Sequence, residues 1–116
     1  MKKFLVLYRA EGALSGISVS EMIARSTPEQ MQSGMAAWQA WREKSGSAIV
    51  DLGAPLDHST TVTGASSSAG KTSITGYTFL QAASLEDAVA LMQGHPHFHM
   101  PGSSAQILEC VPMPGM

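Results

Sequence analysis

The chain has 116 residues, of which 44% are hydrophobic and 14% are charged, and its formal net charge is −2 at pH 7. These values indicate one globular domain over residues 1–116 and exclude a disordered chain. A nucleic-acid partner is not expected, because phosphate binding needs clustered lysine and arginine. No segment approaches the ~18 apolar residues of a membrane span, so no membrane partner is expected. The single cysteine, Cys110, excludes an internal disulfide. Arg9 and Glu11 break the apolar run at the start well short of a signal peptide, so a cytoplasmic protein is expected.

The first half of the chain is predicted to form a strand, a helix and a second strand. The first strand covers Lys3–Arg9, and Ala10–Ser26 is a loop with one short helical turn. Thr27–Gln30 is a helix start, with an N-cap threonine, a proline in the first helical position and a glutamine that closes a capping box. The helix ends near Gly46, and the second strand follows over Ala48–Gly53.

One face of this helix carries apolar residues together with a single arginine. Its members are Met31, Gly34, Met35, Trp38, Trp41 and Arg42. The methionines and tryptophans share the stripe of a capped amphipathic helix, so we expect them to pack in the core rather than to line a ligand site.

A long connection is predicted after the second strand. It contains a short extended segment at Thr60–Thr63 and an exposed, mobile tip at Gly64–Gly70. Residues 65–72, ASSSAGKT, match a relaxed form of the phosphate-binding loop motif in amino-acid sequence. That mechanism needs a strand before the loop and a helix after it, whereas here a strand follows. We therefore interpret these residues as a hairpin tip.

The second half ends with a strand, a helix and a last strand. Ile74–Ala82 is β-branched and aromatic, which favours a largely buried strand. Ser84 is an N-cap, and Gly94 ends the helix that it starts. The apolar face of this helix consists of Leu85, Ala88, Val89 and Met92. The last strand is predicted over Ser104–Val111.

The element order β-α-β-β-α-β predicts an α+β, ferredoxin-like fold, in which two helices cover one face of a four-stranded antiparallel sheet. The strands are apolar at successive positions, as in Phe4–Tyr8 and Tyr77–Leu80, so neither face of the sheet is expected to contact water. No third layer remains in a chain of this length. We therefore expect a homodimer in which two sheets cover each other about a two-fold axis.

Five stretches of the sequence together resemble the YCII-related family. They are FLVLYR in the first strand, TPEQM at the helix start, VDLGAPL after the second strand, ITGYTFLQAASLEDAVALMQGHP, and ILECVPM in the last strand. The similarity spans nearly the whole chain and lies in the order and spacing of strand, cap and turn signatures.

This resemblance implies membership of the dimeric α/β-barrel superfamily, and it implies a homodimer independently of strand composition. The superfamily includes small cofactor-free monooxygenases, muconolactone isomerase-like enzymes and haem-binding proteins, and a His–Asp active site has been proposed for some YCII-related members. Where such relatives carry histidine after the helix-entry proline, this chain carries Gln30, whose neutral amide cannot act as a general base. The acidic DGPF-type motif of a sister group is absent.

The segment His95–His99 has the richest chemistry in the chain. Pro96 biases His95 toward an extended conformation, and alternate residues of an extended run point the same way. Three imidazoles at that spacing are able to bind zinc, copper or nickel. The alternatives are a histidine that lines a ligand pocket and a loop whose histidines interact with the helix end or with solvent. We assign no metal site here.

Further candidate site residues are charged or polar groups on the predicted strands and at the helix start. Asp51 and Glu109 interrupt apolar strands, and Arg9 ends the first strand. They either face a pocket or are exposed strand-end charges. Gln30 and Tyr77 are predicted to contact a ligand, together with His95 and Glu109.

The leading functional hypothesis is a cofactor-independent enzyme that acts on a small organic molecule in a pocket of each subunit. His97 is the expected general acid/base, and Asp51 and Arg9 are the expected orienting or charge-stabilising groups. One alternative is a module that binds a small ligand without turnover, and another is a structural dimer without a pocket. No residue pattern identifies the substrate.

Overall fold

The computed structural model describes residues 1–10, 19–70, 72–100 and 102–115. Its elements, in chain order, are β1 (Lys2–Ala10), α1 (Val19–Arg25), α2 (Pro28–Ser45), η1 (Gly46–Ala48), β2 (Ile49–Asp51), β3 (Ser59–Val62), β4 (Ser67–Gly70), β5 (Ile74–Ala82), α3 (Leu85–Ala90), η2 (Pro96–His99) and β6 (Ser103–Cys110). Residues 11–18 of the loop predicted over Ala10–Ser26, and Lys71 of the phosphate-loop-like segment, lie outside the described residues.

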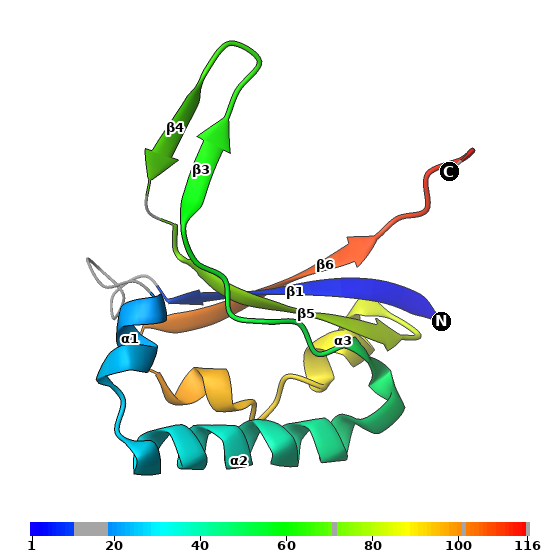
Figure 1. The fold of residues 1–116 in the computed structure, drawn as a ribbon. Helices are drawn as coiled ribbons and strands as arrows, with labels where there is room; N and C mark the ends of the chain where they lie inside the picture. Colours follow the sequence, from blue (N-terminus) through cyan, green and yellow to red (C-terminus); the bar gives the residue numbers. More distant parts are fainter. Residues whose placement is uncertain (11–18, 71, 101, 116) are drawn as a thin grey trace.

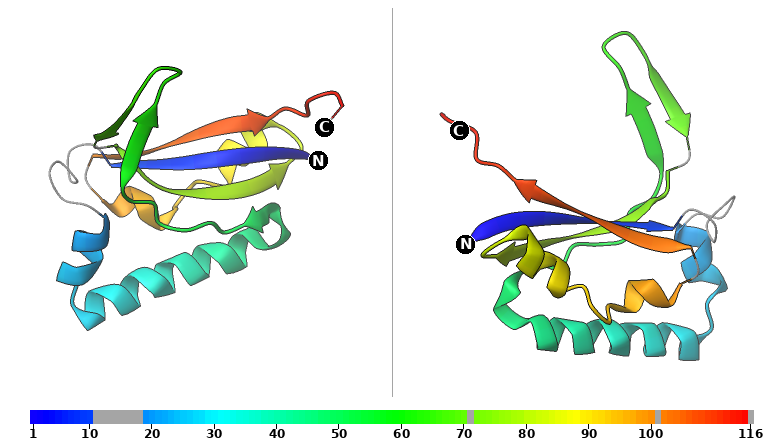
Figure 2. Two further views of the ribbon diagram at one scale, coloured as in Figure 1. Left: turned by 45° about the horizontal axis from the view of Figure 1, so that its top comes forward. Right: turned by 180° about the vertical axis from the view of Figure 1, so that it is seen from behind.

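Four strands form an antiparallel sheet in the order β2-β5-β1-β6, and β3 and β4 form a separate two-stranded sheet. The register places Leu5 opposite Phe79 on one side and Leu108 on the other. The helices all lie on one face of the four-stranded sheet, and the β3–β4 hairpin projects on the opposite side (Figures 1 and 2). The predicted α+β class and four-stranded antiparallel sheet are confirmed.

Local capping signals explain where the helices begin. The Thr27 hydroxyl accepts a hydrogen bond from the Gln30 backbone N–H at 3.1 Å, and the Gln30 side chain accepts one from the Thr27 N–H at 2.9 Å. Ser84 accepts a hydrogen bond from the Asp87 N–H at 3.1 Å in the same way. These bonds satisfy backbone donors that have no partner within the helix, which confirms both predicted N-caps.

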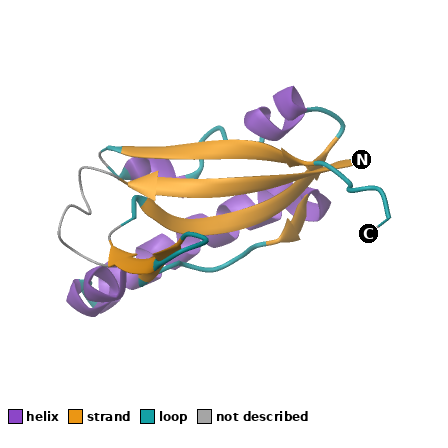
Figure 3. Cartoon of the chain, turned by 90° about the horizontal axis from the view of Figure 1, so that it is seen from above, coloured by secondary structure: helices purple, strands orange, loops and turns teal. Residues whose placement is uncertain are grey.

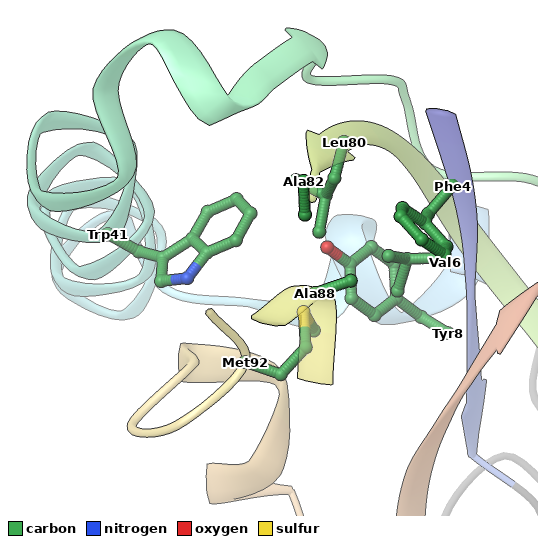
Figure 4. Packing of buried hydrophobic residues seen from close by; sticks show 8 residues of the cluster. All are labelled: Phe4, Val6, Tyr8, Trp41, Leu80, Ala82, Ala88 and Met92. Atoms are coloured by element: carbon green, nitrogen blue, oxygen red, sulfur yellow. The ribbon is translucent and has the colours of Figure 1, made fainter. Parts of the chain in front are cut away.

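The core lies between the helices and the covered face of the sheet (Figure 4). It consists of Phe4, Val6, Tyr8, Trp41, Leu80, Ala82, Ala88 and Met92. The indole N–H of Trp41 donates a hydrogen bond to the Leu91 carbonyl at 2.9 Å, so α2 and the end of α3 are joined by a polar contact as well as by packing. Burial of these side chains from water is the main force that holds the helices on the sheet.

The opposite face of the four-stranded sheet has no covering layer among the described residues (Figure 3). Burial alternates along β1 and β5, because successive side chains of a strand point to opposite faces. The open face carries Leu5, Leu7, Tyr77, Phe79 and Leu108. These side chains are half-buried or exposed within one chain.

One prediction about the helices needs correction. Only Ala88 and Met92 of the predicted apolar face around α3 are buried, whereas Leu85 and Val89 are 49% and 52% exposed. The reason is that α3 has only six residues, so it turns a narrow stripe toward the sheet. Within the described residues, no helix is long and apolar enough to cross a membrane.

Two loop predictions also need correction. His95–His99 does not run extended, because Pro96–His99 forms a 3-10 turn, and the His95 side chain caps it by accepting the His97 backbone N–H at 3.0 Å. The predicted tip at Gly64–Gly70 contains a strand, β4, which pairs with β3. Alternation of small polar residues gives little sequence signal for such a strand.

Candidate functional site

A cavity of about 460 Å³ lies between α2, the loop that follows β2, and the covered face of the sheet. One residue of α1, seven of α2, four of the loop and a group from β1, β5 and η2 form its lining. They are Ile23, Gln30, Met31, Gly34, Met35, Trp38, Gln39, Arg42, Leu52, Gly53, Ala54, Pro55, Tyr8, Thr75, Gly76, Tyr77 and His97. The lining is mostly apolar with a few polar groups, as is typical of small-molecule sites.

The α2 wall corrects the prediction that its methionines belong to the core. Met31 is 38% exposed and Met35 is 62% exposed, and both line the cavity. Trp38 is half-buried and also lines the cavity, whereas Trp41 is buried in the core. The stripe is amphipathic as predicted, but the sheet covers only the part of it around Trp41.

Gly34 leaves open space in the middle of the α2 wall. A Cβ atom built at this position would meet no heavy atom within 4 Å. A glycine inside a helix costs about 1 kcal/mol relative to alanine. Since nothing in the described structure obstructs an alanine side chain here, the glycine widens the cavity at a cost in helix stability.

The opposite wall, Leu52–Pro55, is held tightly against β5. Gly53 has a positive φ of 81°, and a Cβ on it would lie 1.8 Å from the Tyr77 carbonyl oxygen, so only glycine fits. Asp51 accepts the Gly53 backbone N–H at 2.9 Å and thereby stabilises the turn. Pro55 forms an isolated bridge to Gly76. The wall of the cavity is therefore a fixed turn.

A chain of hydrogen bonds runs beneath the cavity from His95 to the loop. His95 Nδ1 accepts the His97 backbone N–H, so the ring proton of neutral His95 is on Nε2, which donates to the Tyr8 hydroxyl at 3.1 Å. Tyr8 in turn donates to the Thr78 hydroxyl at 2.8 Å. Thr78 donates to the Leu52 carbonyl at 2.8 Å. The Leu52 carbonyl can only accept, so the Thr78 hydroxyl must donate to it. The Thr78 hydroxyl therefore accepts from Tyr8, and the Tyr8 hydroxyl accepts from His95.

Burial keeps both titratable members of this chain neutral. His95 is fully buried, and desolvation, together with repulsion from His97 and His99, lowers its pKa to about 4. Desolvation raises the pKa of Tyr8 to about 12, which outweighs the opposing effect of its hydrogen bond with Thr78. His95 also contacts the rings of Trp38 and Trp41, with centroids 4.5 and 4.4 Å away. It is a packed, neutral residue that is not among the residues lining the cavity.

His97 presents a different arrangement, with one ring nitrogen held and the other open. Its Nε2 lies 2.9 Å from the Arg9 carbonyl oxygen and 3.0 Å from the Ser104 carbonyl oxygen. Because both partners only accept, Nε2 carries the proton, and Nδ1 of the neutral ring has a free lone pair. Nδ1 has no hydrogen-bond partner among the described residues, and every fully sealed polar side-chain atom there has one, so Nδ1 is not fully sealed, although His97 as a whole is only 8% exposed.

The structure brings only part of the predicted site together. His97, Gln30 and Tyr77 are among the lining residues, although the strand alternation places the Tyr77 side chain on the open face of the sheet, and His95 is buried outside the lining. The two predicted orienting groups, Asp51 and Arg9, are absent from the lining.

These residues have other partners. Asp51 stabilises the Gly53 turn, and Arg9 donates to the Ser73 hydroxyl at 2.8 Å and to the Gln106 side chain at 3.2 Å. Glu109, a predicted ligand contact, forms an ion pair with Lys2 at 3.0 Å near the end of the sheet. Among the described residues, no three or more side chains are placed so that they could hold a metal ion together. The three histidines of His95–His99 therefore do not converge on a metal site.

Sequence reasoning did not assign Arg42, Gly34 or Trp38 to the site. Their shared stripe on α2 was visible, but that pattern is the same for a core helix and for a cavity wall. Tyr8 is buried and is among the lining residues, and its hydroxyl donates to Thr78 rather than into the cavity.

Comparison with models of known protein families and with curated protein sequences found no match for this chain.

Proposed function

We propose that the cavity binds a small, mainly apolar organic anion and that His97 exchanges a proton with it. The observation that carries the proposal is the state of the His97 ring. Nε2–H is fixed by two backbone carbonyls, and Nδ1 has no hydrogen-bond partner among the described residues, on a residue that lines an apolar cavity. A base held in one tautomer and one orientation is the requirement for general acid–base catalysis.

In this reaction the ligand donates a proton from an acidic O–H or C–H group to His97 Nδ1. The imidazolium that forms keeps its Nε2–H bond to the carbonyl oxygens of Arg9 and Ser104, which stabilise positive charge on the ring. The step uses no cofactor, because the proton passes directly between the ligand and the side chain. His95 acts as a positioning residue, since its ring accepts the His97 backbone N–H and caps the turn that presents His97.

The preference for an anion is supported by the charge of the lining. Arg42 is the one permanently charged residue among the cavity's described lining residues, and that lining contains no aspartate or glutamate. The residues three and four positions away on α2, such as Trp38 and Ser45, offer no carboxylate to pair with it. An anion at this end of the cavity would therefore gain a charge-assisted contact, while its apolar body packs on Met31 and Met35.

We also propose that the chain is a cytoplasmic YCII-related protein that forms a homodimer through its open sheet faces. The strand order β2-β5-β1-β6 supports a ferredoxin-like arrangement of the four long-sheet strands. The uncovered side chains of Leu5, Leu7 and Phe79 support a partner on that face. A dimer would leave both cavities accessible, because they lie on the helix side of the sheet.

Thermal-shift measurements with aromatic carboxylic acids test the cavity. We expect hydroxybenzoates to raise the melting temperature of the wild type more than phenol does, because phenol lacks the anion. Gly34→Leu places a bulky side chain in the cavity from a position whose Cβ meets no other atom and should abolish the shift, whereas Gly64→Leu, on the hairpin, should preserve it. Equal shifts for Gly34→Leu and the wild type would disprove the site.

Proton exchange or product formation then tests His97. His97→Gln keeps an N–H donor for the two carbonyls and removes the base, so it should bind the ligand but convert none of it. A wild type that binds the ligand without turnover would instead support a ligand-binding module. The observation that favours this alternative is that the described lining residues include no carboxylate.

A further inference from the structure

The β3–β4 hairpin stands apart from the rest of the fold. Ser59–Val62 pairs with Ser67–Gly70, and neither strand is hydrogen-bonded into the four-stranded sheet. The turn is closed by the Thr63 backbone N–H, which donates to the Ser66 carbonyl at 2.7 Å. The hairpin rises from the open side of the sheet, away from α2 (Figures 1 and 2). A two-stranded hairpin is marginally stable in water unless another surface supports it.

The composition of the hairpin does not protect its edges. Its eight strand residues are exposed except for the half-buried Ser59, and Val62 is 73% exposed. Residues 59–70 contain no charged residue and no proline. Exposed edge strands normally carry lysine, proline or a bulge, which prevent pairing with another chain. Without those features, each edge of this hairpin is suited to accept a further strand.

A second copy of the chain offers a matching edge. The four-stranded sheet ends at β2, which has three residues, and at β6, which has eight. The outer edge of β6 pairs with no other strand among the described residues. It is therefore the longer of the two edges that a partner's hairpin could extend.

The area of the open face gives an independent reason for an additional contact. Strands of eight or nine residues are about 30 Å long, and four strands are roughly 15 Å wide. The face therefore supplies on the order of 450 Å², about half of the ~800 Å² that each partner buries in a standard interface. Two arms related by a two-fold axis would add the missing area on both sides.

We propose that the β3–β4 hairpin is an arm that adds to the free edge of β6 in a second copy of this chain. The proposal rests on the homodimer proposed above. It assigns a role to a segment that the cavity does not use. In the dimer each chain would give one arm and receive one, and the arm would be ordered by backbone hydrogen bonds with its partner.

Sedimentation equilibrium of three proteins tests the arm. In the first variant a Gly-Ser pair replaces residues 59–70, and in the second Thr61→Lys places a charge on β3. We expect the wild type to dimerise, the shortened chain to dissociate at least tenfold more readily, and Thr61→Lys to show an intermediate effect. Ala65→Lys, at the turn outside both strands, is the matched control and should dimerise like the wild type.

Hydrogen exchange of the wild type gives a readout that needs no variant. Backbone amides of residues 59–70 and of β6 should exchange more slowly as protein concentration rises through the dimerisation range. Unchanged exchange in both segments, or normal dimerisation of the shortened chain, would overturn the arm and leave the sheet-face dimer intact. A wild type that is monomeric at every concentration would overturn the dimer and the arm together, while ligand binding in the cavity would be unaffected.

Discussion

The two faces of the four-stranded sheet differ in how far their side chains are buried within one chain. On the helix-covered face, Tyr8 and Thr78 are buried, and their hydroxyls are joined in one hydrogen-bond chain. On the open face, Leu7 and Phe79 come from the same two strands but have only partial cover within the chain. Successive side chains of a strand point to opposite faces of the sheet. The same strand can therefore bury one set of side chains within its own chain and leave the other set for contact with a partner.

A second contrast lies within the covered face, between two histidines separated by one proline. Both ring nitrogens of His95 have partners, and burial keeps the ring neutral. His97 uses one nitrogen for structure, and the other has no hydrogen-bond partner among the described residues. The buried histidine therefore contributes to the scaffold, and its neighbour contributes to the proposed chemistry.

Truncation of the core should have the largest effect on stability. Trp41→Ala removes a buried indole and the hydrogen bond to the Leu91 carbonyl, so we expect a loss of about 3–5 kcal/mol in the free energy of unfolding. Urea denaturation followed by circular dichroism measures it. Leu108→Ala on the open face is the comparison and should cost the monomer under ~1 kcal/mol. Similar losses at the two positions would remove the distinction between the faces.

Acid should destabilise the covered face through His95. Its pKa is lowered from 6.5 to about 4 in the folded chain, so between these values the unfolded chain binds a proton that the folded chain does not. The contribution of His95 to the free energy of unfolding is therefore complete above pH 6.5. It is lost as the pH drops toward 4, and the loss is about 3 kcal/mol at most.

Denaturation at pH 7.5 and at pH 5 measures this dependence. His95→Gln should flatten it, and His58→Gln is the control because the His58 side chain is 86% exposed. An equally steep loss in the His95→Gln protein would assign the pH dependence to other groups.

Breaking the hydrogen-bond chain should have a smaller effect. Thr78→Val leaves the Tyr8 hydroxyl without its acceptor and the Leu52 carbonyl without its donor, so we expect a loss of about 1–3 kcal/mol. Chemical denaturation measures the loss. Thr60→Val on the exposed hairpin makes the same chemical change and should alter stability by under ~0.5 kcal/mol. If Thr78→Val left the free energy of unfolding unchanged, the hydrogen-bond chain would contribute nothing to the stability of the covered face.

The smallest expected effect is a gain in stability at the cavity wall. Gly34→Ala should stabilise the protein by up to about 1 kcal/mol, because the new methyl group meets no atom and α2 loses a flexible residue. Thermal melts measure the gain. Gly76→Ala is the contrast, since its Cβ would lie 3.3 Å from the Ala54 carbonyl oxygen, and it should destabilise. A destabilising Gly34→Ala would show that the cavity is narrower than described.

Much of the fold followed from local signals. The strand Ile74–Ala82 was predicted with its observed bounds, and the caps at Thr27 and Ser84 form the hydrogen bonds that their side chains predict. The strand β4 was missed because Ser67–Gly70 has neither apolar alternation nor β-branched residues. The 3-10 turn after Pro96 was missed because its cap is the side chain of His95, a residue type with no strong capping preference.

The candidate site was predictable only in part. His97 and Gln30 were chosen for their chemistry, and they line the cavity, whereas the side chain of Tyr77, another lining residue, lies on the open face. Arg9 and Asp51 had equally suitable chemistry, but the sheet geometry and the Gly53 turn direct them elsewhere. Chemistry alone did not distinguish the two groups.

The sequence by itself determined the local elements, because caps, turn glycines and strand composition act over a few neighbouring residues. Only the tertiary structure decided which side of α2 faces a cavity, which histidine is sealed and which is open. Those outcomes depend on contacts between residues far apart in the chain, such as Tyr8 with His95 and Thr78 with Leu52. Burial and hydrogen-bond geometry at such contacts arise when the layers pack, and no short stretch of sequence encodes them.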